Sequence, residues 1–222
     1  MNSMTVEWAV NLSDFYQLMA IGLRYPTREL AEGLREGTYE TDAAGCLTDL
    51  GGNKAATEAV CEALRSAAQK DADTAEGLFE KMRIAYTGLF LVPERERVFI
   101  YESRFCYPKE ADPKDYSMFL SPCALHVEQM YREAGVQVRK GLQEPPDHMA
   151  TELEFLSWLY RKLAEALNGT KEKAELWNWR IREFQEKHLG RWYDAFLQQV
   201  EEKSELETYQ RLAKLGRALD RG

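Results

Sequence analysis

Cysteine is scarce in this chain of 222 residues, and its few cysteines form no familiar ligand or disulfide pattern. The four are Cys46, Cys61, Cys106 and Cys123, with no pair at the C-x-x-C spacing. Zinc sites and small disulfide-linked domains are typically marked by such pairs or by a dense cysteine framework. We therefore expect four free, buried thiols and a reducing compartment, the cytoplasm.

The motifs of common enzyme classes are also missing. The chain has no G-x-x-x-x-G-K-[ST] loop, no G-x-G-x-x-G segment after a strand and no G-x-S-x-G elbow. It has three histidines, His126, His148 and His188, and nothing in the sequence places a nucleophile beside them. His148 and Glu152 share one predicted helix face, but two ligands without a third favour a surface or capping role over a metal site. We predict a protein that is not an enzyme and that carries no metal or cofactor.

Long apolar runs are absent as well. The most apolar short stretch, residues 84–92, is too short to cross a bilayer, and residues 1–16 lack the basic and apolar regions of a secretory signal. The net charge of −8, from 29 basic and 37 acidic side chains, disfavours binding to nucleic-acid phosphates. The same charge favours encounter with a basic peptide. We expect neither stable membrane insertion nor a nucleic-acid partner.

Apolar side chains instead recur with the 3.6-residue period of an α-helix along nearly the whole chain. Proline, glycine and capping residues separate the periodic segments. The predicted helices are residues 6–23, 28–34, 53–70, 73–90, 122–135, 146–167, 171–184, 190–200 and 204–219. The pattern predicts an all-α protein, a compact bundle of roughly ten helices.

Prolines mark two breaks in this pattern. Residues 91–122 contain four of the seven prolines and no helical period, which predicts a long loop. Pro145 and Pro146 predict a hinge, and Pro146 is suited to begin the next helix. We expect a single domain over residues 1–222, with an N-terminal half at 5–140, a hinge at 141–147 and a C-terminal half at 148–220. A monomer is expected, and exchange of halves in a domain-swapped dimer stays open.

Three segments carry a family resemblance. Residues 144–156, E-P-P-D-H followed by M-A-T-E-L-E-F-L, closely resemble the E-P-x-D-H … E-L-x-F-L/M signature of the TorD/DmsD/NarJ superfamily of redox-enzyme maturation chaperones. Residues 86–93 are similar to the superfamily's aromatic-x-x-L-F segment, and residues 101–103 match the Y-E-S that follows it. Residues 184–196 are similar to its F-x-x-H-L-x-x-W-x-x-x-F pattern. The resemblance spans residues 86–200, while the first eighty residues match only as generic helices.

The resemblance implies a function and a set of site residues. Members bind the twin-arginine signal peptide, or an equivalent N-terminus, of a molybdoenzyme catalytic subunit, and hold the precursor until its molybdopterin cofactor is inserted. The cofactor belongs to the client. The implied peptide-binding residues are Glu144, Asp147 and His148 in a polar part, Tyr86, Leu89 and Phe90 in an apolar part, and Tyr101, Glu102 and Ser103 at the groove edge.

The chemistry of the polar residues fits such a role. Glu144 and Asp147 are suited to bidentate contact with a guanidinium, and His148 to a hydrogen bond that varies near neutral pH. Asp147 is expected in the first turn of a helix, where its charge offsets the helix dipole. The residues alone leave another interpretation open, in which Asp147 serves only the helix start and the aromatic segment near Tyr86 belongs to the core.

Two alternative functions also stay open. One is an assembly factor of the NarJ type for a reductase that is not exported. The other is a weak guanine-nucleotide-binding switch, although the chain has no phosphate loop. The sequence does not identify the client reductase.

Overall fold

The computed structural model describes residues 4–92, 98–106, 121–136 and 145–219. Within these ranges, the elements are α1 (Val6–Leu23), α2 (Arg28–Glu36), α3 (Thr38–Asp49), α4 (Lys54–Asp71), α5 (Ala75–Tyr86), a π-helix (Thr87–Leu91), α6 (Glu102–Phe105), α7 (Pro122–Glu133), α8 (Met149–Leu167), α9 (Lys171–Lys187), a 3₁₀ turn (Leu189–Arg191), α10 (Tyr193–Lys203) and α11 (Glu207–Arg217). The all-α prediction is confirmed.

Local chemistry explains where many of these helices begin and end. The hydroxyls of Thr27, Thr74 and Ser121 each accept a hydrogen bond from a backbone N–H in the first turn of the helix that follows. Pro122 occupies the first turn of α7, where its missing N–H leaves no helical bond unmade. Gly37 ends α2 with a left-handed φ of 82°, a conformation that glycine adopts without strain.

Four sequence predictions need correction. Helix α3 was not expected, and the segment expected as one helix to residue 90 widens into a π-helix after Tyr86. The predicted loop at 91–122 contains the short helix α6. Helix α8 begins at Met149 rather than at Pro146. Residues 145–148 are extended or in a turn, because their backbone bonds to the segment before α6 instead of entering the helix.

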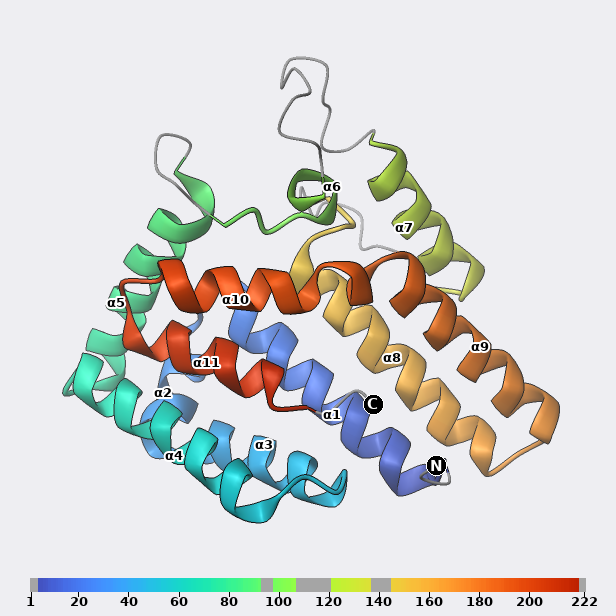
Figure 1. Ribbon diagram of the computed structural model, residues 1–222, viewed down its shortest axis with the longest axis horizontal. Helices are drawn as coiled ribbons and strands as arrows, with labels where there is room; N and C mark the ends of the chain where they lie inside the picture. Colours follow the sequence, from blue (N-terminus) through green and yellow to red (C-terminus); the bar gives the residue numbers. More distant parts are fainter. Residues whose placement is uncertain (1–3, 93–97, 107–120, 137–144, 220–222) are drawn as a thin grey trace.

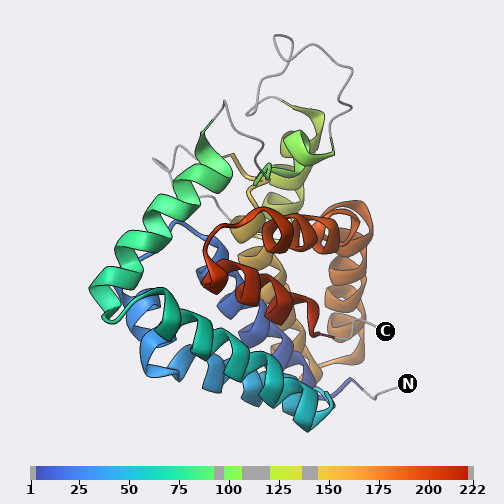
Figure 2. The same ribbon diagram turned by 60° about the vertical axis from the view of Figure 1, so that its left-hand side comes forward.

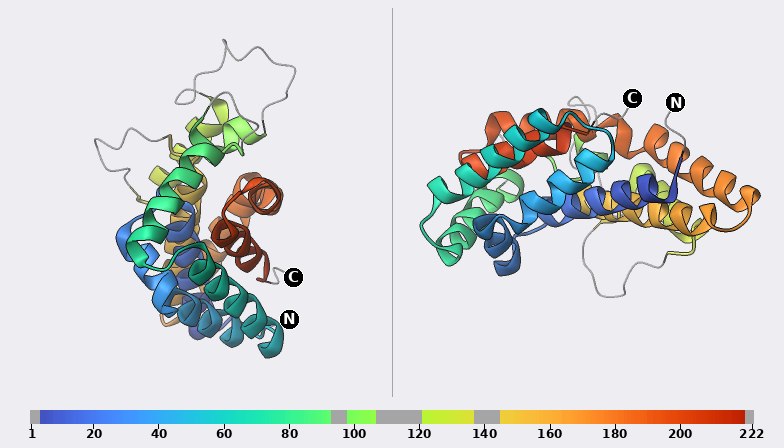
Figure 3. Two further views of the ribbon diagram at one scale, coloured as in Figure 1. Left: turned by 90° about the vertical axis from the view of Figure 1, so that its left-hand side faces the viewer. Right: turned by 90° about the horizontal axis from the view of Figure 1, so that it is seen from below.

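The helices pack in pairs that join distant parts of the sequence. Helix α1 lies along α8, α8 lies beside α9, and α4 packs against α11, which also packs against α10 (Figure 1). Turned views show the α10–α11 pair on one face of the layer that holds α1 and α8 (Figures 2 and 3). Gly22 of α1 permits close approach of α11, since a Cβ there would lie 2.9 Å from the side chain of Leu212.

The predicted hinge at 141–147 lies mostly outside the described residues, so the hinge and the division into halves stay predictions. All four cysteines are free, but only Cys46 and Cys61 are buried. The prediction of four buried thiols is wrong for Cys106, which is exposed, and for Cys123, which is half-buried. Among the described helices, none combines the length and the apolar character that a bilayer span requires.

Candidate functional site

Two of the motif segments meet through their backbones. The N–H of Glu102 donates to the carbonyl of Asp147 at 2.9 Å, and the N–H of Met149 donates to the carbonyl of Ile100 at 2.9 Å. These bonds form an isolated antiparallel bridge between the segment that enters α6 and the segment that enters α8. The Y-E-S and E-P-P-D-H motifs, which lie more than forty residues apart in the sequence, therefore occupy one place in the fold.

The third motif segment reaches the same place from the end of α9. His188 ends this helix, and its Nδ1 lies 2.7 Å from Glu102 Oε2, with both side chains buried. The indole N–H of Trp192 donates to Glu152 Oε2 at 3.1 Å. We call the buried polar side chains gathered here the polar cluster: Glu102, Ser103, Asp147, His148, Glu152 and His188.

Asp147 is fully buried in the polar cluster. The backbone N–H of Ser103 donates to its Oδ2 at 2.9 Å, while Oδ1 has no hydrogen-bond partner among the described residues. Burial raises the pKa of this carboxyl, and the bonds from Ser103 oppose that effect. The expected place in the first helical turn is wrong, because Asp147 precedes Met149, the first residue of α8, by two positions. In this conformation its side chain holds the Tyr101–Phe105 segment and does not face solvent.

His148 is the N-cap of α8. Its Nδ1 accepts a hydrogen bond from the N–H of Ala150 at 3.1 Å, and its Nε2 lies 3.4 Å from the hydroxyl of Tyr86. Burial lowers the pKa of the imidazole to about 3. The expected surface or capping role holds for His148, which caps α8, but is wrong for Glu152, which is fully buried. The expectation of a hydrogen bond that varies near neutral pH is wrong, because the ring stays neutral there.

Glu152 lies under the cluster on α8 and is fully buried. Burial, followed by the negative charge of Glu102, raises the pKa of its carboxyl well above the usual range. Its Oε1 has no geometric hydrogen-bond partner among the described residues. Several buried acids close together, with oxygens left unpaired, are costly for stability and are typical of functional sites.

The predicted apolar residues form the floor of this region. Tyr86, Leu89 and Phe90 are buried, with the Tyr86 and Phe90 rings edge to face at 4.8 Å and the Phe90 ring stacked on Phe196 at 5.9 Å. Tyr101 is half-buried and meets the His148 ring edge to face at 5.4 Å. Glu144 lies outside the described residues. The assignment of these residues to peptide binding stays a prediction.

Two surface hollows adjoin these residues. One has a volume of about 510 Å³ and opens over Glu102, and it is lined by Glu102, Pro122, Cys123, His126, Glu186, Lys187, His188 and Arg191. The other, of about 290 Å³, lies where the π-helix meets the α10–α11 turn. Its wall includes Leu89 and the 71% exposed side chain of Ile84, so it offers apolar surface to a partner.

Sequence reasoning missed several members of this site. Glu152 stands inside the quoted E-L-x-F motif but was considered only as a weak metal ligand. His188 and Trp192 stand in the third motif, whose pairing with the first two becomes visible only in three dimensions. Cys123 and His126 belong to no motif, and no signal in the sequence pointed to them.

Comparison with known proteins places these motifs in a family. The model of the family described as nitrate reductase delta subunit matches residues 52–198, about two thirds of the chain. A chlorate reductase assembly chaperone protein from Ideonella dechloratans is 37% identical over 71 residues, which are 32% of this chain and 36% of that protein. A selenate reductase assembly chaperone protein from Thauera selenatis is 34% identical over 71 residues, with the same shares.

The chain thus covers little more than a third of each of these two relatives. The family match is broader, since it extends from the start of α4 almost to the end of α10 and includes all three motif segments that meet at the polar cluster. The resemblance to the TorD/DmsD/NarJ superfamily is confirmed, and the protein belongs to the nitrate reductase delta subunit family.

Proposed function

We propose that the protein is an assembly chaperone for a molybdenum-containing reductase. It binds the N-terminal, twin-arginine signal region of the catalytic subunit and holds the precursor for molybdopterin insertion before export or assembly. The family match over about two thirds of the chain carries this proposal. The two relatives named as assembly chaperones of chlorate and selenate reductase support it.

The surfaces beside the polar cluster suit such a client. A signal region offers arginines and an apolar segment. The larger hollow has the carboxylates of Glu102 and Glu186 in its wall, together with the cationic side chains of Lys187 and Arg191, and the smaller one has the apolar side chains of Ile84, Leu89 and Leu206. A carboxylate in one hollow suits an arginine of such a peptide, and the apolar wall of the other hollow suits its apolar segment.

Burial supports a positioning role for Asp147 and His148. Asp147 binds the backbone at Ser103 and Glu102, and His148 caps α8 while its backbone pairs with Tyr101. Together they hold Glu102 on the floor of the larger hollow. Loss of either side chain then weakens client binding by shifting the Tyr101–Phe105 segment, without removing a direct contact.

The test is recovery of the client from the native host. The chain carries an affinity tag, and proteins that copurify are identified by mass spectrometry for the wild type and for Asp147→Ala and His148→Ala. A variant at the exposed Gln129 serves as a control. We expect a molybdoenzyme catalytic subunit with the wild type and the control, and much less with the two cluster variants, whose helicity is checked by circular dichroism. Absence of any such subunit while one is being made would refute the proposal.

A second candidate is an assembly factor for a reductase that is not exported, and the family match supports a reductase client in either case. The same experiment separates the two, because the recovered subunit either carries a twin-arginine signal or does not. Removing the first residues of the recovered subunit abolishes binding only if the signal region is recognised. No feature of the described residues favours the guanine-nucleotide alternative.

A further inference from the structure

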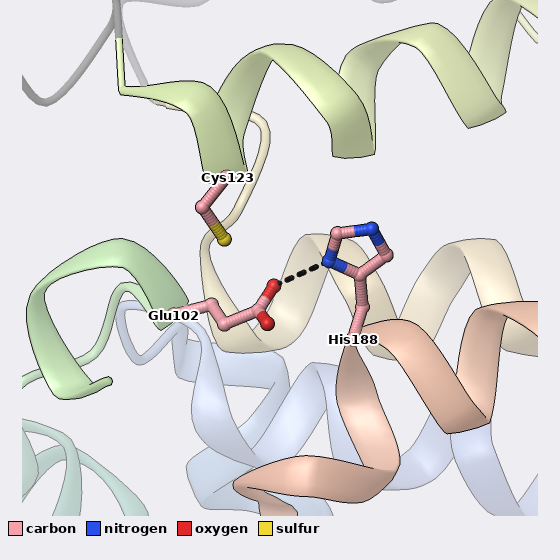
Figure 4. Close-up of side chains that lie close together, drawn as sticks. All are labelled: Glu102, Cys123 and His188. Carbon is pink, nitrogen blue, oxygen red and sulfur yellow. Dashed lines mark hydrogen bonds and ion pairs between the residues drawn. The ribbon is translucent and has the colours of Figure 1, made fainter. Parts of the chain in front are cut away.

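Three side chains with metal-binding atoms converge on the floor of the larger hollow. Glu102 comes from α6, Cys123 from the first turn of α7, and His188 from the end of α9 (Figure 4). One ligand atom from each lies within 4.8 Å of the other two. The side chains point toward one another, and the hollow that they line gives a path from solvent.

The three types of donor atom favour zinc. A thiolate sulfur, an imidazole nitrogen and a carboxylate oxygen are the three ligand types that Zn²⁺ accepts in proteins. The Cys123 thiolate and the Glu102 carboxylate together carry two negative charges, which balance the dication while His188 stays neutral. A charge-neutral complex is the form that a largely buried place tolerates, because an unbalanced charge there is costly.

Zinc binding requires the three ligand atoms, which now lie within 4.8 Å of one another, to adjust their spacing. Zn–N, Zn–O and Zn–S bond lengths in a tetrahedral site place ligand atoms about 3.3–3.6 Å apart. His188 Nδ1 and Glu102 Oε2 are now 2.7 Å apart across a hydrogen bond, so a metal ion would replace the shared proton and separate them slightly. Binding releases the thiol proton, and the imidazole proton moves to Nε2.

A fourth residue supports the imidazole in that state. His126 Nδ1 lies 2.7 Å from His188 Nε2. Once the proton of His188 has moved to Nε2, this N–H donates a hydrogen bond to His126 Nδ1. Metal-ligating histidines almost always have such a partner on the other ring nitrogen, which fixes the tautomer. Three protein ligands leave the fourth tetrahedral position open toward the hollow, as in zinc sites that exchange a ligand.

We propose that Glu102, Cys123 and His188 form a zinc-binding site, supported by His126, with one coordination position open to an external ligand. The proposal goes beyond the chaperone function and does not depend on it. It differs from an ordinary buried Glu–His pair, which would hold the α6 and α9 ends together without any affinity for a metal.

Cobalt provides a direct test on the purified, reduced full chain. After treatment with a chelator, Co²⁺ is added while absorption is followed, and Zn²⁺ is then added in competition. We expect one Co²⁺ per chain, the intense visible bands of tetrahedral cobalt and a thiolate-to-cobalt charge-transfer band, all removed by Zn²⁺.

Variants locate the ligands. Cys123→Ser, at a half-buried position, removes the charge-transfer band, and Cys106→Ser leaves it unchanged. His126→Gln weakens Zn²⁺ binding by about 10–100-fold while the band remains. Glu102→Gln, checked for folding by circular dichroism, weakens binding and keeps the thiolate signal. Absence of stoichiometric binding, or a band that survives Cys123→Ser, overturns the proposal.

Discussion

The contact between α1 and α8 consists mainly of packed aromatic rings. The polar cluster, by contrast, gathers buried acids and histidines. We call the first the α1–α8 seam, defined here by Trp8, Ser13, Tyr16, Ser157 and Tyr160. In the seam, Tyr16 stacks on Tyr160 at 5.7 Å and Trp8 meets Tyr160 edge to face at 5.8 Å. Its two serines satisfy each other, since the Ser13 and Ser157 hydroxyls bond at 3.1 Å.

The polar cluster instead buries acids, and Asp147 Oδ1 and Glu152 Oε1 have no hydrogen-bond partner among the residues that the structure describes. Burial of apolar area stabilises the seam, whereas unpaired polar atoms in the cluster reduce stability. The seam therefore stabilises the fold, whereas the cluster carries a cost in stability of the kind that is typical of functional sites. Three predictions test this contrast, from the largest expected effect to the smallest.

The largest effect on stability is expected from a cavity in the apolar core next to the seam. Phe15, fully buried in the core on α1 beside Tyr16, is replaced by alanine. We expect the free energy of unfolding to fall by about 3–5 kcal/mol, because transfer and cavity terms add. Urea unfolding followed by circular dichroism measures the loss. A loss below about 1 kcal/mol would mean that the core around α1 is loosely packed and would remove the contrast.

A smaller effect on the free energy of unfolding, which depends on pH, is expected from His148 in the polar cluster. The pKa of His148 is about 3 in the folded chain, against about 6.5 when unfolded, so its contribution to stability is complete above pH 6.5 and is lost as the pH falls toward 3. At pH 4 the loss is about 3 kcal/mol. His148→Asn keeps an N-cap acceptor for α8 but does not titrate.

Unfolding free energies of the two chains, measured between pH 7.5 and pH 4, provide the check. The native chain should lose about 3 kcal/mol relative to His148→Asn over this range. The comparison cancels the opposite contributions of Asp147 and Glu152, whose raised pKa values favour the folded state at low pH. If the unfolding free energies of the two chains changed by the same amount between pH 7.5 and pH 4, His148 would not be buried as a neutral ring.

The smallest effect concerns the polar pair inside the seam. Ser13→Ala leaves the buried Ser157 hydroxyl without its partner and should cost about 1 kcal/mol, whereas replacing both serines by alanine should be nearly neutral. A double-mutant cycle on unfolding free energies measures the coupling. Additive losses would show that the two hydroxyls do not depend on each other, and the seam would then lack its satisfied polar pair.

The sequence predicts those elements whose signals are local. The limits of α1 follow from its apolar period and from the proline after it, and the start of α7 follows from Ser121 and Pro122. Helix α3 was missed because Thr38–Asp49 contains three threonines, two aspartates and a glycine and shows little amphipathic pattern. The start of α8 was misplaced because Pro146 suggests a helix start locally, while bonds to a distant segment keep its backbone out of the helix.

The sequence identified several residues of the candidate site but not how they are arranged in space. The family motifs named Glu102, Asp147 and His148, but a motif cannot tell whether a side chain faces solvent or the interior. Their burial depends on α6 and α8 meeting, which no local pattern encodes. The partners His188 and Cys123 come from two further elements, so the metal-binding geometry could not be read from spacing along the chain.

The pairing of α4 with α11 has a consequence for synthesis. Leu64 and Ala68 of α4 belong to the core, and α11 supplies Leu212 and Leu215 to the same core. A chain emerging from the ribosome therefore exposes apolar surface on α4 until residue 217 has been translated, because its covering helix is made more than 130 residues later. A nascent chain stalled before α11 would be a target for proteases, and completion of the fold would follow translation.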